Sequence, residues 1–205
     1  MTRDRDGFTL KPLTPSRWSD LERLFGDRGA CGGCWCMYWR LTRPEFERGK
    51  GAGNRRAFKT LVAKGTARGV IAYHDREPVA WCAAGPREDF PRLARSRVLS
   101  PIDDQPVWSV TCFFVLRPYR RRGLTVRLLA AAAEMAGRAG ARLVEGYPVE
   151  SRGARMPDVF AWTGLSGAFR RAGFEECARR SPTRPIMRRA ATGPQATARA
   201  LRIRT

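Results

Sequence analysis

The stretch from Val107 to Gly140 constrains the fold of this chain most, because strand, turn and helix signals follow one another in it without a gap. Val107–Leu116 is rich in β-branched and aromatic residues, which predicts the longest strand of the chain. Pro118 ends that strand, and the alanine- and leucine-rich run Gly123–Gly140 predicts a helix. A strand that feeds directly into a helix is typical of α/β domains.

The other apolar patterns predict further strands and helices on both sides of this unit. The remaining strands are expected at 8–13, 69–74, 79–84, 143–149, 174–179 and 184–189, and the remaining helices at 15–26, 54–64 and 165–172, with a helical piece beginning at 37–41 and one helical turn at 90–95. The strands at 69–74 and 79–84 flank a turn-like Asp-Arg-Glu-Pro and therefore read as a hairpin. This order predicts an α/β domain with a mixed, partly antiparallel sheet.

Length and composition favour one domain over residues 1–190, with two small domains as the alternative. Residues 191–205 are small, polar and basic, so we expect a disordered tail there. No apolar run is long enough to cross a bilayer, and the first residues lack the apolar core of a signal peptide. We therefore expect a cytoplasmic protein with free thiols and no membrane partner, and leave a homodimer open.

The net charge is +20, carried by 35 arginines and four lysines against 19 acidic residues. A basic surface attracts polyanions, so a nucleic-acid partner is one explanation. The arginines are spread along the chain and form no single block, which favours a general compositional bias. An anionic cofactor is a third explanation for part of the charge.

A tight basic turn joins the long strand to its helix, with the sequence Arg120-Arg121-Arg122-Gly123-Leu124-Thr125. A helix N-terminus offers unpaired N–H donors and the positive end of a dipole, which suits a diphosphate. Gly123 permits close approach of the backbone. The turn is neither a Walker loop nor a dinucleotide fingerprint, because Gly-Lys-Ser/Thr and G-x-G-x-x-G are missing. An ordinary connecting turn with surface arginines is the alternative.

These residues resemble the R/Q-x-x-G-x-G/A signature of the GNAT superfamily of acyl-CoA-dependent N-acetyltransferases, with Thr125 departing at its last position. A second likeness is Phe169-Arg-Arg-Ala-Gly173-Phe174, which is similar to the family's late helix running into Gly-Phe and a strand. The resemblance extends over residues 8–189. It implies a GNAT-like sheet with helices on both faces and a splayed strand pair that admits CoA.

The resemblance also implies an activity, which is transfer of an acetyl group from acetyl-CoA to a primary amine of a small molecule or peptide by direct attack. The pantetheine arm is expected beside Phe113–Arg117, with a backbone amide near Phe114 or Val115 as the oxyanion donor. The diphosphate is expected on the amides of residues 121–125. The implied cofactor-binding residues are Phe114, Val115, Arg117, Arg120, Arg121, Arg122, Gly123, Leu124 and Thr125.

The acid and base of the reaction are less evident. In many relatives a tyrosine four residues before the Gly of Gly-Phe protonates the departing thiolate, but here that position is Phe169. Tyr147 is the expected substitute, with a plain core tyrosine as the alternative. Glu145 shares its strand face by period-two alternation and is the expected base, with a surface glutamate as the alternative. Glu150 and Asp158 are weaker candidates.

An unusual segment runs Cys31-Gly-Gly-Cys-Trp-Cys-Met-Tyr-Trp-Arg40 and resembles Cys-Trp-Cys-Met segments in other members of the superfamily. Cys31, Cys34 and Cys36 could give three thiolates to zinc, but no second Cys-x-x-Cys supplies the fourth ligand, so we predict no metal site. Small buried residues in a tight turn are the alternative reading of these cysteines.

In the GNAT fold this first helical region borders the acceptor site. The expected pocket residues are Trp35, Met37, Tyr38, Trp39 and Arg40, with core packing as the alternative. Two rivals to the enzyme stay open. One is a basic nucleic-acid-binding or regulatory protein on the same fold, and the other is an acyl-CoA-sensing protein without catalysis.

Overall fold

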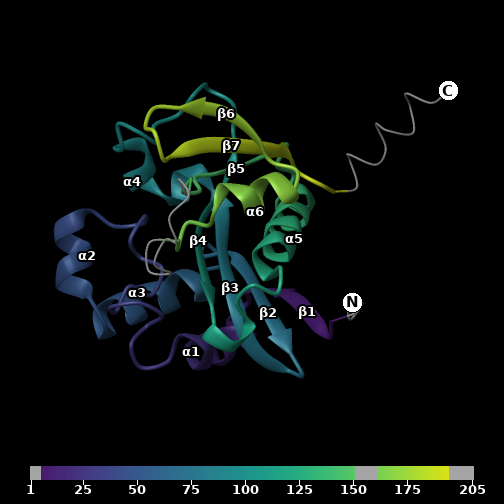
Figure 1. Ribbon diagram of the computed structural model, residues 1–205. Coiled ribbons are helices and arrows are strands. Elements are labelled where there is room, and N and C mark those ends of the chain that lie inside the picture. Colours follow the sequence, from purple (N-terminus) through teal and green to yellow (C-terminus); the bar gives the residue numbers. More distant parts are fainter. Residues whose placement is uncertain (1–5, 151–160, 194–205) are drawn as a thin grey trace.

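A computed structural model describes residues 6–150 and 161–193, which form one seven-stranded sheet in the order β1-β2-β3-β4-β5-β7-β6 (Figure 1). Every neighbouring pair is antiparallel except β4 and β5, which run parallel. The strands are β1 (Phe8–Pro12), β2 (Gly69–His74), β3 (Glu77–Pro86), β4 (Trp108–Val115), β5 (Leu143–Gly146), β6 (Glu175–Arg179) and β7 (Pro185–Ala190). The mixed, partly antiparallel sheet expected from the sequence is confirmed.

Helices cover both faces of the sheet, as expected. They are α1 (Trp18–Phe25), α2 (Arg43–Gly49), α3 (Ala52–Ala63), α4 (Pro91–Ala94), α5 (Leu124–Arg138) and α6 (Ser166–Arg171). Leu21 of α1 and Phe58 of α3 pack with Trp81 of β3 on one face, while Leu128 of α5 packs with Cys82 on the other. Figure 1 shows α5 on the opposite side of the strands from α1 and α3.

The β2–β3 hairpin is tighter than its sequence suggests. Its turn is only Asp75 and Arg76, both at positive φ (49° and 71°), which is the geometry of a two-residue turn that matches the twist of the strands. Glu77 pairs with His74, so β3 begins inside the expected four-residue turn.

The described fold differs from the sequence-based expectation in two further places. Residues 37–41 form turns, and the helix that follows them, α2, was not expected. This helix begins with a capping box in which Thr42 and Glu45 bond each other's backbone and side-chain groups. The strand expected to reach Val149 ends at Gly146, and Pro148 beyond it has no amide for a ladder.

The parallel pair β4–β5 comes apart after three residue pairs. Trp108, Ser109 and Val110 pair with β5, whereas the rest of β4 continues to Val115 without β5 beside it. This confirms the splayed strand pair, and it leaves one edge of β4 free of strand partners over five residues. We call residues 111–115 on this side the open edge of β4.

The chain continues past β7 along α5. Ala191 is buried and its amide donates to the carbonyl of Arg142, while the amide of Thr192 donates to that of Ala133. Residues 151–160 and the rest of the expected tail lie outside the described residues. No helix among the described residues combines the length and apolar character that a membrane span requires.

Candidate active site

The turn before α5 is shaped as an anion site. Gly123 has a φ of 72° and precedes the first helical residue, Leu124. The first bonds of the helix are donated by Val126 and Arg127 to the carbonyl of Gly123, so the preceding amides have no partner within the helix. A Cβ placed on Gly123 would meet nothing within 4 Å, which leaves open space beside these donors.

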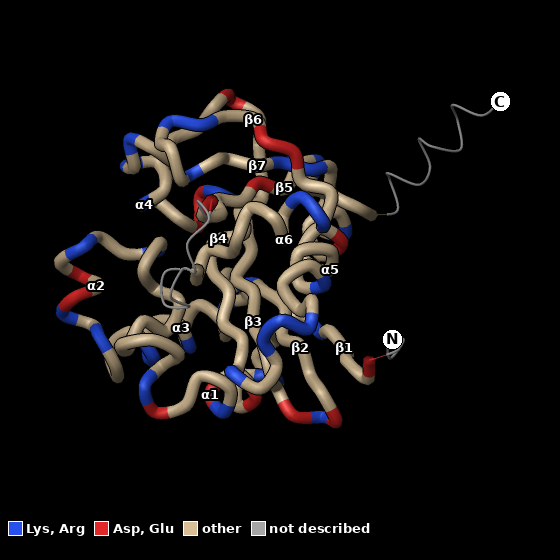
Figure 2. The backbone as a smooth tube through the Cα atoms, in the orientation of Figure 1, with Lys and Arg blue, Asp and Glu red and all other residues tan. Residues whose placement is uncertain are grey.

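Arginines surround this turn, and Figure 2 shows the basic residues gathered along it. Arg117, Arg120, Arg121 and Arg122 are all exposed. The Nε of Arg120 donates to the carbonyl of Val115 at 3.0 Å, which ties the turn to the end of β4. Backbone donors and cations therefore meet in the way that a diphosphate requires. The expected phosphate-binding residues are brought together.

The open edge of β4 is partly engaged. The Phe113 amide donates to the carbonyl of Trp162 at 2.6 Å, and on the other edge the Leu116 amide donates to a carbonyl of β3 at 3.0 Å. Successive amides of a strand point to alternate sides. The Val115 amide therefore faces the open edge with that of Phe113, while the Phe114 amide faces β3. Of the two amides expected as oxyanion donors, only that of Val115 lies on the open edge.

Aromatic side chains from residues 31–40, which we call the Cys-Trp segment, lie against this edge. The indole Nε1 of Trp39 donates to the carbonyl of Thr111 at 3.2 Å. The ring of Trp162 lies 5.7 Å from that of Trp39 and 5.2 Å from that of Tyr38. Tyr38 and Trp39 are thereby placed beside the splayed strands.

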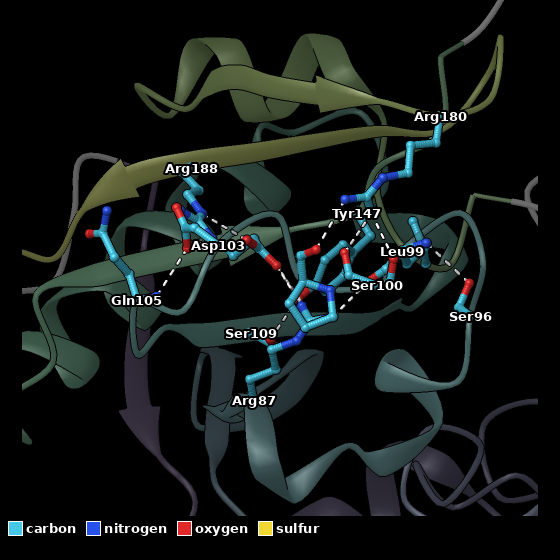
Figure 3. A network of polar contacts seen from close by, with 12 residues as sticks. Arg87, Ser96, Leu99, Ser100, Asp103, Gln105, Ser109, Tyr147, Arg180 and Arg188 are labelled. Carbon is cyan, nitrogen blue, oxygen red and sulfur yellow. Dashed lines mark hydrogen bonds and ion pairs between the residues drawn. The ribbon is translucent and has the colours of Figure 1, made fainter.

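Tyr147 belongs to a buried network of polar side chains (Figure 3), and it bonds Glu145 within that network. The Tyr147 hydroxyl donates to the Glu145 carboxylate at 2.6 Å and lies 2.7 Å from the Ser109 hydroxyl. Arg87 and Arg188 bond the two oxygens of Glu145 at 2.6 and 2.7 Å. The shared face predicted for Glu145 and Tyr147 is therefore present.

This network is closed to solvent, which differs from the expected placement at a reacting centre. Glu145 is 1% exposed and Tyr147 is fully buried. Burial and then the neighbouring carboxylate raise the pKa of Tyr147 well above its usual value, so its hydroxyl keeps its proton at neutral pH. The network joins β4, β5 and β7 just where β4 and β5 separate.

The weaker candidate Glu150 lies elsewhere. Its carboxylate pairs with Arg170 at 2.9 Å and Arg179 at 2.8 Å and accepts a hydrogen bond from Ser166. These bonds, that from Arg170 first, lower its pKa to about 2. Asp158 lies outside the described residues.

A cavity of about 440 Å³ lies between α2 and α4, beside Trp39. It is lined by Tyr38, Trp39, Arg40, Leu41, Thr42, Arg43, Glu45, Pro91, Arg92, Arg95 and Ser96. A second cavity of about 450 Å³ shares Arg40 with the first and is lined also by Met37 and Asp89. Four of the five expected pocket residues therefore line a cavity.

Trp35 is the exception, because it is part of the core. Its indole is buried against Trp18 and Phe25 at 6.0 and 5.6 Å between ring centres. Trp35 and Cys36 both have positive φ, 45° and 54°, so the chain turns sharply and directs neighbouring side chains to different places.

The cysteines of this segment are free thiols. Cys36 is buried and its sulfur accepts a hydrogen bond from the Trp81 indole at 3.0 Å. Bonding to the Cys112 thiol, with further help from Trp81 and Arg40, lowers the pKa of Cys36, while burial raises that of Cys34 to about 12. Among residues 6–150 and 161–193, no three side chains of His, Cys, Asp or Glu gather closely enough to hold a metal ion.

Sequence reasoning missed several residues that shape this region. Arg87 and Trp162 come from connections without periodic signals, and Arg92 lies in the short helix α4, so their places follow from the packing of distant segments. The Thr42–Glu45 pair was the one local signal available, because Thr-x-x-Glu before a helix is a capping box.

Comparison with known proteins shows the family to which this chain belongs. Residues 35–151 match the sequence model of the acetyltransferase (GNAT) family, which is more than half of the chain. The match includes the open edge of β4, the basic turn and β5. None of the curated proteins compared with this chain is significantly similar to it.

Solved structures resemble this fold over nearly its full length. AAC(6′)-Ib in complex with ribostamycin and coenzyme A is 17% identical, with 95% of this chain and 97% of that chain covered and a TM-score of 0.54. A GNAT-family acetyltransferase from Listeria monocytogenes is 10% identical, covering 93% and 98%, with a TM-score of 0.54. The protein yncA from Salmonella typhimurium, with its cofactor acetyl-CoA, is 10% identical, covering 91% and 95%, with a TM-score of 0.50. At these identities the likeness is one of fold.

Proposed function

Because this chain belongs to the GNAT family of acetyltransferases, we propose that it transfers an acetyl group from acetyl-CoA to a primary amine of a small molecule or peptide. The observation that carries the proposal is the open edge of β4 leading directly into the basic turn and the N-terminus of α5. An extended thioester arm and a diphosphate need these two features in this order. Solved relatives of the same fold hold acetyl-CoA or coenzyme A.

The basic turn would hold the diphosphate. The amides of residues 121–125 supply donors, Arg121 and Arg122 supply charge, and the open space at Gly123 lets the phosphates approach the backbone. Burial of the small side chains Ala132, Ala133 and Ala136 sets α5 close to the sheet, so this N-terminus is held firmly.

The open edge of β4 would hold the thioester. The Val115 amide is aimed at that side and would donate to the thioester carbonyl, most strongly when its oxygen becomes an oxyanion. The neutral acceptor nitrogen forms the new C–N bond and gives up a proton, the C–S bond breaks, and the departing thiolate takes up a proton. Acetyl-CoA supplies the activated acyl group, and the protein supplies position and hydrogen bonds.

Glu145 and Tyr147 are proposed to act by position. Both are buried and bonded to one another, to Arg87 and to Arg188, so neither meets an acceptor amine in this arrangement. They fix β4 and β5 at their last paired residues and thus set the angle at which the strands separate. Their roles as acid and base stay predictions from the sequence.

One observation favours a second candidate, an acyl-CoA-binding protein without catalysis. Phe169, at the position where relatives often have a tyrosine, is fully buried against Phe113 and Phe174. Tyr147 is fully buried too. Neither position therefore offers an accessible hydroxyl to a departing thiolate.

Calorimetric titration with acetyl-CoA and, separately, with ADP at moderate salt tests the cofactor. We expect one-site binding of acetyl-CoA at least about tenfold tighter than ADP, because only acetyl-CoA reaches the open edge of β4. Thiol release is then measured over a panel of amines. Tight binding with no release for any amine would favour the sensor. Binding no better than that of ADP would leave the turn as a merely basic surface.

A further inference from the structure

The cavity between α2 and α4 has an unusual electrostatic character. Four arginines line it, namely Arg40, Arg43, Arg92 and Arg95, against one acidic residue, Glu45. The Glu45 carboxylate accepts hydrogen bonds from the amide and hydroxyl of Thr42, as part of the cap of α2. It is thereby held to the start of its own helix, and the cavity keeps an excess of positive charge.

Arg40 is a largely buried member of the lining, and it also lines the second cavity. Its side chain is only 6% exposed, and the guanidinium stacks 4.5 Å from the Phe90 ring centre. One terminal nitrogen, Nη1, donates to the backbone carbonyl of Asp89 at 3.3 Å. The other, Nη2, is buried and has no hydrogen-bond partner among the residues that the structure describes. A buried guanidinium donor without a partner is costly, and a carboxylate is its natural acceptor.

The nearest protein carboxylate does not meet this need. Asp89 Oδ2 lies 3.8 Å from Nη1 of Arg40 and 3.6 Å from Arg68, and it too has no hydrogen-bond partner among the described residues. The Asp89 carboxylate thus lies between two arginines, and its distance to each is longer than a hydrogen bond. Arg40 therefore has one guanidinium nitrogen, Nη2, whose hydrogen-bonding capacity no described residue uses.

One part of the lining is aromatic. Tyr38 and Trp39 present aromatic rings, and Arg92 stacks 3.9 Å from the Tyr38 ring centre, which fixes that wall. The volume of about 440 Å³ suits a small molecule. Trp39 also donates to Thr111 on the open edge of β4, so this cavity adjoins the place proposed for the thioester.

We propose that this cavity selects an acceptor amine that carries a carboxylate beside a planar apolar body, with Arg40 as the residue that binds the carboxylate. An aromatic amino acid, or a peptide-like amine of that kind, has this chemistry. The assignment of the amine end rests on the proposed function, whereas binding of the carboxylate does not require turnover.

The test uses two product-like probes that differ only in the carboxylate, N-acetyl-L-phenylalanine and N-acetylphenethylamine. Each is titrated into the full-length protein saturated with CoA. We expect N-acetyl-L-phenylalanine to bind at least about tenfold tighter, which corresponds to about 1.4 kcal/mol. Equal affinities, a preference for N-acetylphenethylamine, or no binding of either probe would overturn the assignment.

Variants separate the cavity from general charge. Arg40→Gln should abolish the preference for the carboxylate, and Arg95→Gln, at an exposed position that tolerates substitution, should reduce it severalfold. Arg48→Gln removes the same charge from α2 at a residue outside the cavity and should leave the preference intact. A preference unchanged in folded Arg40→Gln, or unchanged in Arg95→Gln if Arg40→Gln does not fold, would place the carboxylate elsewhere.

Thiol release from acetyl-CoA with phenylalanine and with phenethylamine then distinguishes the two proposals. If no amine gives release while the probe preference persists, the proposed function fails and the carboxylate site stands. If phenethylamine is acetylated as efficiently as phenylalanine, the proposed transferase function stands and the carboxylate site fails.

Discussion

The carbonyl oxygen of Trp162 accepts a hydrogen bond from the amide of Phe113 at 2.6 Å, on the side of β4 that β5 has left. A residue far along the chain thereby supplies the partner that a neighbouring strand would otherwise provide. Two residues further, no such partner is described for the Val115 amide. Along the open edge of β4, the Phe113 amide is therefore bonded, while the Val115 amide has no partner on that side among residues 6–150 and 161–193.

We expect acetyl-CoA to protect the Val115 amide from hydrogen exchange, because the thioester arm would bond it on the open edge. The Phe113 amide should already be protected in the free protein. Exchange measured by NMR with and without saturating acetyl-CoA checks this, and ADP serves as the control because it lacks the arm. Unchanged exchange at Val115 under saturation would contradict the strand-edge assignment.

Replacement of Gly123 by valine should weaken acetyl-CoA binding more than about tenfold. At a φ of 72° a β-branched side chain is strained, and its Cβ would enter the space beside the amide donors. Gly140→Val is the matched control, since Gly140 has a φ of 85°, meets equally open space and lies beyond the other end of α5. Both variants should lose about 1–2 kcal/mol of unfolding free energy. Equal affinity loss in the two would remove the turn from the binding site.

Tyr147→Phe should lower the free energy of unfolding by about 1–3 kcal/mol, because Arg87, Ser109 and Glu145 all lose a buried partner. We expect turnover of the folded variant to fall less than about tenfold. Urea unfolding and thiol release give the two readouts. Tyr73→Phe is the control, as its hydroxyl bonds the partly exposed Asp20 and should cost less. A much larger fall in turnover at unchanged acetyl-CoA affinity would assign Tyr147 the acid role.

Glu150 should make stability depend on pH in the acid range. Hydrogen bonds from Arg170, Ser166 and Arg179 lower its pKa from 4.5 to about 2 in the folded chain. Because the pKa is lower in the folded chain, ionised Glu150 contributes to the free energy of unfolding above about pH 4.5, and this contribution is lost as the pH falls toward 2. Urea unfolding at several pH values should show this loss, and Glu150→Gln should remove that part of it. If the variant retains the full wild-type pH dependence, the ion pairs do not form in solution.

Local signals were sufficient for the elements that depend on neighbouring residues. The β2–β3 hairpin follows from two apolar runs around polar turn residues, and α5 follows from an alanine-rich run behind Gly123. The pairing of Glu145 with Tyr147 follows from strand alternation alone. The two arginines that bond Glu145, Arg87 and Arg188, come from segments far away in sequence. Residue spacing therefore could not predict them.

The Cys-Trp segment shows why side-chain placement was harder to predict. Trp35 and Trp39 look alike as pocket aromatics, yet one is packed in the core and the other bonds β4. The positive φ at Trp35 and Cys36 breaks any helical or strand period, so sequence spacing carries no information on direction there. Likewise, strand alternation predicted the sheet face on which Glu145 lies, but it could not predict that other side chains bury Glu145 there.

The way that α5 is flanked at its two ends also decides how the protein can be handled. A Cβ on Gly137 would collide with the backbone of Thr192. The last described residues therefore pack closely against the C-terminal end of this helix. Asp6 pairs with Arg127 near the other end. The helix has 15 residues and spans about 22 Å. A tag that replaces residues 194–205 would therefore start at the far end of α5 from the basic turn, whereas one that replaces residues 1–5 would start near the basic turn.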